Sequence, residues 1–242
     1  TTDPVKEYLY NAVKDLVLAV PELAGIITIT MSENMTNCHS RRNNTCKFCS
    51  HLKPQDVVPE VNNIMSRAVK DAGVKTKVLA NLWGWTEGYG WSKEAVLEGI
   101  EKMDKDIEIM SVSEVGTIIN KDRKERVGEY SLSKVGPSEE TKENLSFAKK
   151  IGRRTLAKVQ INNSWELAIV PFIPVFELVK EHMENLKNIG VNGLMMSWTL
   201  GGYPSVSLKL ASEIFEGDFD YDKWLNENFS ENAKVVKKAV KE

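Results

Sequence analysis

Apolar residues fall into five short runs along the chain, and longer segments with apolar positions three and four residues apart separate them. Continuous short apolar runs are typical of buried parallel strands, and the three-and-four spacing is typical of amphipathic helices. The predicted strands are 25–31, 76–82, 106–112, 156–161 and 193–197. The predicted helices are 3–20, 57–72, 92–103, 139–151, 175–189, 204–215 and 221–241. This alternation predicts an α/β fold with a parallel sheet.

The number of strand–helix units bears on the architecture. A closed (β/α)8 barrel needs eight strands and typically about 250 residues, whereas this chain of 242 residues offers five strands. We therefore expect an incomplete (β/α)8 TIM-type barrel, formed by its C-terminal part; a complete five-stranded open sheet is the alternative. An incomplete barrel exposes a strand edge, which another copy or a missing N-terminal barrel half would cover. We expect one α/β domain over 1–242, with a cysteine-rich loop at 34–55 and a charged excursion at 116–153, in which residues 128–136 form either a small hairpin or an excursion.

Three of the predicted strands are followed by a carboxylate. Glu33, Glu114 and Glu166 each come just after a strand, and parallel strands bring such ends to one rim of a sheet. Two carboxylates flanking a glycosidic bond can act as general acid and as nucleophile or base. Charged residues at strand ends also commonly cap the next helix, so each Glu alone has a structural reading as well. Together they are candidate catalytic residues.

Tryptophans and amides gather at the same predicted strand ends. Indoles present large apolar faces to sugar rings, and amides can both donate to and accept from sugar hydroxyls, although a single Trp more often packs a core. Basic residues and phosphate-binding glycine motifs are missing there, which favours a sugar over a phosphate. A Thr-Leu-Gly-Gly-Tyr-Pro segment follows the last strand. The candidate substrate-binding residues are Asn34, Asn81, Trp83, Trp85, Asn163, Trp165, Trp198 and Tyr203.

All three cysteines lie in the 34–55 loop. Cys38, Cys46 and Cys49 with His51 supply the four soft ligands of a tetrahedral zinc site, and His39 is an alternative fourth ligand. Such a zinc would be structural, and catalysis by carboxylates requires no cofactor. One disulfide with a remaining thiol, or three thiols, are the other readings of this spacing.

Charge and composition exclude some classes of function. Lys and Arg number 32 against 34 Asp and Glu, for a net charge of −2, which argues against a nucleic-acid-binding face. No apolar run approaches the length of a membrane span, and the sequence opens without a signal peptide, so we expect a soluble protein, cytoplasmic or secreted.

Three segments resemble bacterial members of the β-N-acetylhexosaminidase superfamily of (β/α)8 glycoside hydrolases. They are residues 28–34 with the Cys-His-Ser and Cys-x-x-Cys continuation, Asn-Asn-Ser-Trp-Glu at 162–166, and residues 195–205, which run from Met-Met-Ser-Trp to Tyr-Pro-Ser. The rest of the chain resembles the family loosely. The resemblance implies that Glu33 is the general acid of the fourth barrel strand and that Trp198 lines the sugar pocket. Ser32 stands where the family has the Asp that orients the substrate acetamido group, so a Glu33/Glu166 pair is the competing mechanism.

These observations predict a glycoside hydrolase-type domain that acts on a carbohydrate. Glu33 would be the acid, Glu166 the nucleophile or stabiliser, and Glu114 a supporting residue. A non-catalytic carbohydrate-binding domain is one alternative. A zinc-stabilised interaction or assembly domain is another, and a zinc-dependent enzyme is the least favoured.

Overall fold

The computed structural model describes residues 2–31, 37–40, 47, 51–122, 125–163, 167, 169–198 and 202–239. The chain divides into two compact units. Unit 1 comprises Thr1–Ser111 and Glu143–Leu156, and unit 2 comprises Val112–Lys142 and Ala157–Glu242. Each unit is described by itself below, and a single domain over 1–242 stays a prediction.

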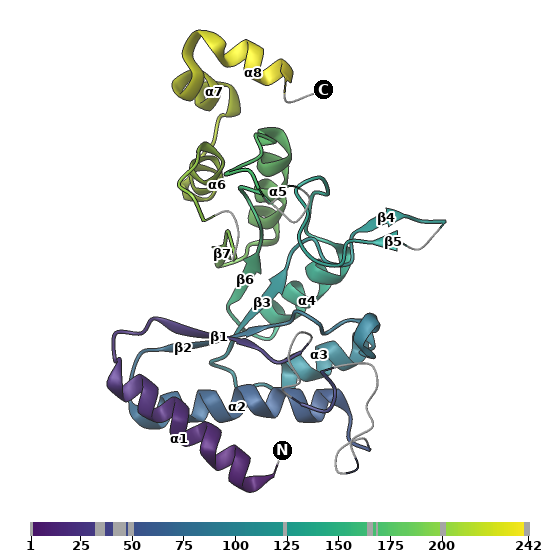
Figure 1. Cartoon of the computed structure of the whole chain (residues 1–242), viewed down its shortest axis with the longest axis vertical. Helices are drawn as coiled ribbons and strands as arrows, with labels where there is room; N and C mark the ends of the chain where they lie inside the picture. Colours follow the sequence, from purple (N-terminus) through teal and green to yellow (C-terminus); the bar gives the residue numbers. More distant parts are fainter. Residues whose placement is uncertain are drawn as a thin grey trace. The chain divides into compact units, whose positions relative to one another are not determined.

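Five strands form one sheet in the order β1 (Gly25–Ile29), β2 (Lys77–Asn81), β3 (Glu108–Val112), β6 (Thr155–Lys158) and β7 (Gly193–Met195). The strands are parallel and alternate with helices, which confirms the expected α/β fold (Figure 1). Neighbouring strands follow chain order throughout, whereas a doubly wound open sheet reverses its order at a switch point. This order is that of successive strands in a (β/α)8 barrel, so the architecture is consistent with part of such a barrel.

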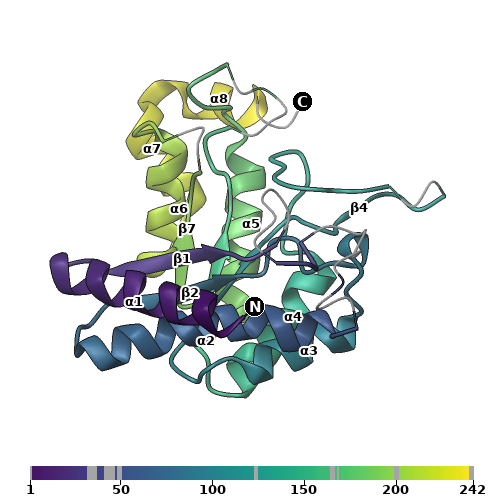
Figure 2. The same cartoon turned by 60° about the horizontal axis from the view of Figure 1, so that its bottom comes forward.

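Unit 1 places α1 (Asp3–Ala19) and α2 (Pro54–Ala72) side by side, as Figures 1 and 2 show, and α2 also packs against α3 (Lys93–Lys102). Sequence signals set the helix ends. Pro54 lies in the first turn of α2, where its missing N–H costs nothing, and Gly73 ends this helix with a left-handed φ of 69°. The Ser92 hydroxyl accepts a hydrogen bond from the Ala95 N–H and caps α3. A one-turn helix, η1 (Glu87–Tyr89), precedes α3.

The core of unit 2 lies between β6 and the two helices α5 (Phe176–Ile189) and α6 (Val206–Glu216), which run side by side in Figure 2. Gly190 ends α5 with a φ of 71°, and the N–H groups of Gly190 and Val191 both bond to the Leu186 carbonyl. The buried apolar side chains of this core include members from β6 and the residues directly after it, α5, α6 and α7 (Tyr221–Phe229): Ala157, Val159, Ile161, Val179, Met183, Leu186, Leu210, Ile214 and Trp224.

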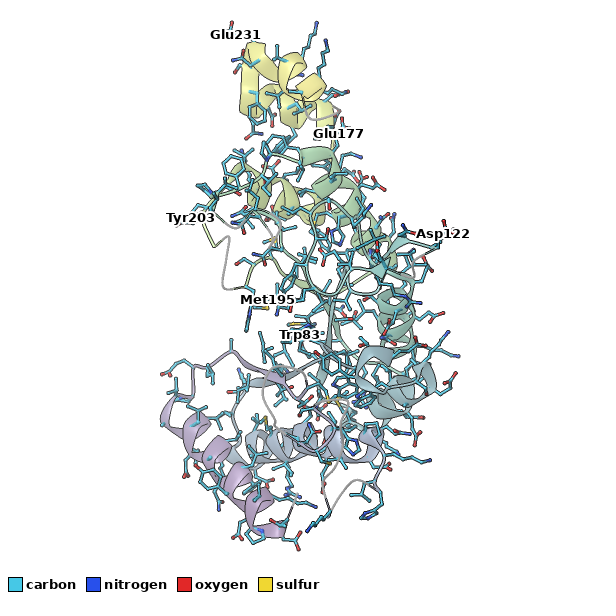
Figure 3. All side chains as sticks on the ribbon, turned by 45° about the vertical axis from the view of Figure 1, so that its right-hand side comes forward. Trp83, Asp122, Glu177, Met195, Tyr203 and Glu231 are labelled. Carbon is cyan, nitrogen blue, oxygen red and sulfur yellow. The ribbon has the colours of Figure 1, made fainter. Side chains whose placement is uncertain are left out.

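Two predicted elements differ from the structure. The hairpin of the charged excursion pairs β4 (Ile118–Asn120) with β5 (Glu125–Arg126), so it lies before residues 128–136, which contain no strand and for which a hairpin was one of two alternatives; Asp122 lies between its two strands, as Figure 3 shows. The last helix is not continuous, because Ser230 adopts a φ of 48° after α7 and a short turn, η3 (Ser230–Asn232), precedes α8 (Ala233–Ala239). The excursion ends in α4 (Glu139–Lys150), close to its predicted range.

Among the described helices, none is long and apolar enough to cross a lipid bilayer.

Candidate functional site

In unit 1, the predicted substrate residues after β2 differ in their access to solvent. Asn81 is 1% exposed, and its side-chain oxygen accepts the Trp83 N–H at 3.1 Å, which forms the turn that follows the strand. Trp83 is half-buried. Trp83 is therefore the residue of this segment that keeps part of its surface accessible.

Trp85 belongs to the core of unit 1. Its ring stacks on Trp91 with centroids 4.4 Å apart, both indoles are 1% exposed, and the Trp85 N–H lies 3.3 Å from the Thr30 hydroxyl. The backbone of Gly99 in α3 approaches so closely that a Cβ there would lie 2.9 Å from the Trp85 ring. Because its faces are covered by protein, Trp85 packs the core of unit 1.

In unit 2, the end of β3 leads into a buried group of three polar side chains. The Ser113 hydroxyl lies 2.6 Å from Nε2 of His182 on α5, and Oε1 of Glu114 lies 3.6 Å from Nδ1 of the same ring. Backbone bonds to Lys158 and Ser138 hold Ser113 in place. All three residues are buried: Ser113 and Glu114 are 0% exposed, and His182 is 5% exposed.

Burial determines the charge of this group. Burial lowers the pKa of His182 from 6.5 to about 4, so the ring is neutral at pH 7 and its approach to Glu114 is not a contact between two full charges. Serine on one ring nitrogen and a carboxyl on the other is the order found in hydrolytic triads. Here, however, a Cβ on Gly136 would lie 2.6 Å from both Nε2 and the Ser113 hydroxyl, so the loop backbone covers the nucleophile position. The group links the segment after β3 to α5, and Glu114 belongs to it.

The residues of β6 and its continuation alternate strictly between two environments. Ala157, Val159 and Ile161 enter the apolar core with α5 and α6. Lys158, the last residue of β6, and Gln160 and Asn162, which follow the strand, alternate with them along the chain. All three are buried, with exposures of 1%, 3% and 0%. A lysine this deeply buried is rare in proteins, which makes this face the most unusual chemical feature of unit 2.

The Lys158 ammonium lies close to two aromatic rings. Its Nζ is 3.9 Å from the centroid of Trp198, which follows β7, and 5.1 Å from the centroid of Tyr130, which belongs to the connection between β5 and α4. Attraction between a cation and the electron-rich face of an aromatic ring stabilises both partners, more so away from water. Trp198 is nevertheless 40% exposed. The arrangement fixes a partly exposed indole at the carboxyl end of β7.

The two amides after β6 hold the neighbouring loops. The Asn162 amide donates to the Tyr203 carbonyl at 2.6 Å and accepts from the Ser205 hydroxyl, which also caps α6. The Asn163 amide donates to the Val170 carbonyl at 2.7 Å, and its oxygen accepts from Gln160. Asn163 is 1% exposed, and its bond to the Val170 carbonyl anchors this loop.

Tyr203 is 62% exposed and projects from the segment before α6, as Figure 3 shows. Of the predicted substrate residues in unit 2 that the structure describes, Trp198 and Tyr203 are the exposed ones. Both belong to the connection between β7 and α6, whose described residues are anchored through Lys158 and Asn162.

Several predicted site residues lie outside the described residues. They are Glu33, Asn34, Cys46, Cys49, Trp165 and Glu166. Of the remaining proposed zinc ligands, Cys38 is half-buried in a turn and His51 is exposed just before α2, while burial lowers the pKa of His39. Within the described part of the chain, no three His, Cys, Asp or Glu side chains form a potential metal site. The zinc stays a prediction.

Sequence reasoning missed Lys158, Tyr130 and the Ser113–His182 pair. A signal for Lys158 is present, because Ala-Lys-Val-Gln-Ile-Asn at 157–162 alternates apolar and polar residues where a parallel strand is usually apolar on both faces. The Ser113–His182 pair spans 69 residues and has no local signal.

No family model matches the chain, and neither a curated protein nor a solved structure is significantly similar to it.

Proposed function

We propose that the chain is a carbohydrate-binding, glycoside hydrolase-type domain in which Trp198 is a stacking surface for a sugar ring. The observation that carries the proposal is the fixed, 40% exposed indole of Trp198 at the carboxyl end of a parallel strand, with Lys158 3.9 Å from its ring centroid. Ligands of parallel α/β folds bind at the carboxyl ends of strands. An indole held in one orientation loses little conformational freedom when a sugar stacks on it.

Hydrolysis would be the work of Glu33 and Glu166, the two carboxylates predicted after the first and fourth strands. Glu114 is not offered for this role, because its carboxyl group is fully buried beside His182. The acid would protonate the leaving oxygen, and the second carboxylate would attack or stabilise the anomeric carbon.

Binding is tested with a panel of aryl glycosides that includes N-acetylhexosaminides, measured by calorimetry on the full chain. Trp198→Ala should weaken binding of the best ligand at least tenfold, because stacking of an aromatic ring contributes about 1 kcal/mol beyond its buried area, and the area itself adds more. Tyr8→Ala is the matched control, since Tyr8 is a 74% exposed aromatic on α1 and should have no effect. Binding of none of the glycosides, or equal binding by both variants, would overturn the proposal.

Catalysis is tested separately by release of the aryl group. Glu33→Gln and Glu166→Gln should each lower turnover by several orders of magnitude while leaving the binding constant within a few-fold. If the wild-type chain binds a glycoside through Trp198 but releases no aryl group, the non-catalytic carbohydrate-binding domain is the correct reading. The complete burial of Glu114 is the observation that favours this second candidate.

A further inference from the structure

The loops that follow β6 and β7 in unit 2 expose large apolar side chains. Leu167, Ile169 and Phe172 precede α5 and are 45%, 91% and 36% exposed, and the exposed rings of Trp198 and Tyr203 precede α6. Single exposed apolar side chains are normal on protein surfaces, whereas several that gather in one place mark a ligand or partner surface. We refer to these five residues as the apolar rim.

The two loops lie together because both bond to Asn162. The Ile173 N–H donates to the Asn162 carbonyl at 2.5 Å, and the Asn162 side chain donates to the Tyr203 carbonyl at 2.6 Å. Phe172 directly precedes Ile173, so Phe172 and Tyr203 are each within one residue of an atom that bonds to Asn162. Trp198 follows β7, the strand that pairs with β6, and belongs to the same connection as Tyr203. The aromatic members of the apolar rim therefore belong to one edge of unit 2.

The loop before α5 has a fixed conformation although it exposes apolar residues. Ile173 and Val175 are partly buried and pack against the core of unit 2. Pro171 and Pro174 restrict the backbone around Phe172, because the proline ring fixes φ. A surface that is already ordered loses little conformational freedom when a ligand covers it, so more of the gain from burial appears as affinity.

The loops of the apolar rim also lack charge. Residues 167–176 and 202–208 contain no Asp, Glu, Lys or Arg, although such residues make up 27% of the chain. A ligand that covers these segments gains free energy from the apolar area removed from water and none from ion pairs with them. Because the rim includes Trp198, the indole proposed to stack on a sugar, we expect this apolar group to be attached to the sugar itself.

We propose that the apolar rim binds a hydrocarbon aglycone, so that the preferred ligand is an amphiphilic glycoside whose sugar stacks on Trp198 and whose hydrocarbon chain covers Phe172 and its neighbours. This inference rests on the proposed carbohydrate binding and adds the chemical class of the aglycone. No bond is made or broken at the rim, which acts in binding and specificity.

The test varies the length of the alkyl chain on a constant sugar. Methyl, butyl and hexyl β-glycosides of glucose and of N-acetylglucosamine are compared by calorimetry on the full chain, below the concentrations at which they form micelles. A fully buried methylene group raises affinity about fourfold, and a chain covered on one side gains half of that free energy, or about twofold per methylene. The hexyl glycoside should therefore bind about thirtyfold more tightly than the methyl glycoside. Affinity that does not rise with chain length overturns the inference.

Phe172→Ser should lower the ratio of hexyl to methyl affinity about threefold or more while retaining the affinity for the methyl glycoside. Ile169 is 91% exposed, so Ile169→Ser should fold and lower the same ratio, which keeps the test decisive if Phe172→Ser does not fold. The matched control is Ile119→Ser, because Ile119 is a 49% exposed apolar residue on β4 in the same unit, and this variant should keep the full ratio. A ratio that is unchanged in both rim variants refutes the assignment.

1-Hexanol and phosphatidylcholine vesicles test other occupants of the apolar rim, since neither carries a sugar. Hexanol that binds as tightly as the hexyl glycoside, or vesicle binding that Phe172→Ser abolishes, would overturn the inference in favour of a general apolar site or a membrane surface. The outcomes also separate the two proposals. Equal affinity for methyl and hexyl glycosides refutes the aglycone inference alone, whereas binding of neither alkyl nor aryl glycosides refutes the carbohydrate function itself.

Discussion

Acidification should destabilise unit 2 through His182, which the fold keeps neutral. The pKa of this ring lies near 4 in the folded chain because burial disfavours its charged form, against 6.5 in the unfolded chain. Between these two values the unfolded chain binds a proton that the folded chain does not. The free energy of unfolding should therefore be highest above pH 6.5 and fall as the pH drops from 6.5 toward 4.

The magnitude follows from the gap between the two pKa values. At about 1.4 kcal/mol per pH unit, the gap from 6.5 to about 4 corresponds to about 3 kcal/mol of stability, a large fraction of the total for a domain of this size. His182 is 5% exposed, so solvent screening reduces this figure little.

The assay is urea unfolding between pH 7 and 4, followed through the amide resonances of α5, which report on unit 2. Other groups also titrate in this range, so the comparison is with His182→Gln, which keeps a neutral partner for Ser113. Between pH 7 and pH 4, the wild type should lose about 3 kcal/mol more of its free energy of unfolding than His182→Gln does.

The protonation of His182 can also be followed directly, because with three histidines in the chain its ring signal is easily identified. The ring Cε1 proton signal of His182, assigned by its loss in the Gln variant, should not shift until the pH approaches 4. A signal that titrates near 6.5, or a stability difference that stays constant over the pH range, would refute the burial argument.

Three substitutions test packing and hydrogen bonding within the two units. Gly136→Ala should lower the stability of unit 2 by about 1 to 3 kcal/mol, because its Cβ would lie 2.6 Å from the Ser113 hydroxyl and the His182 ring; urea unfolding measures this, and a change below about 0.5 kcal/mol contradicts it. Gly99→Ala should likewise cost about 1 to 3 kcal/mol in unit 1, because the new methyl group meets the stacked indoles, and the near-UV circular dichroism of those indoles should change with it. Asn162→Ala should cost about 1 to 3 kcal/mol and increase hydrogen exchange at the first turn of α6; unchanged exchange there would show that the Ser205 cap stands without it.

Much of the fold was accessible from the sequence because it depends on local patterns. The strands fall within a few residues of their predicted positions, and Gly73 and Gly190 end their helices as expected, since a left-handed residue at that position favours glycine. The break at Ser230 was not predicted, because serine has no strong preference for the positive φ that it adopts there.

The candidate site was accessible only in part, because exposure is decided by packing partners that are distant in sequence. Trp85 and Trp198 both follow a strand, but the first is covered by Trp91 and the close backbone of Gly99, while the second stays partly exposed over a lysine. No spacing rule separates the two cases. His182 lies in a predicted helix, and its meeting with Ser113 depends on how α5 packs, which a sequence pattern does not encode.

The two-sided character of β6 also limits how this strand can change. Deleting or inserting one residue within it would interchange its faces and turn Lys158 toward the apolar core that contains Met183 and Leu210. An insertion or deletion here should therefore be tolerated only when it changes the strand by an even number of residues. A chimera that exchanges this strand must likewise keep its alternation of apolar and polar positions in register.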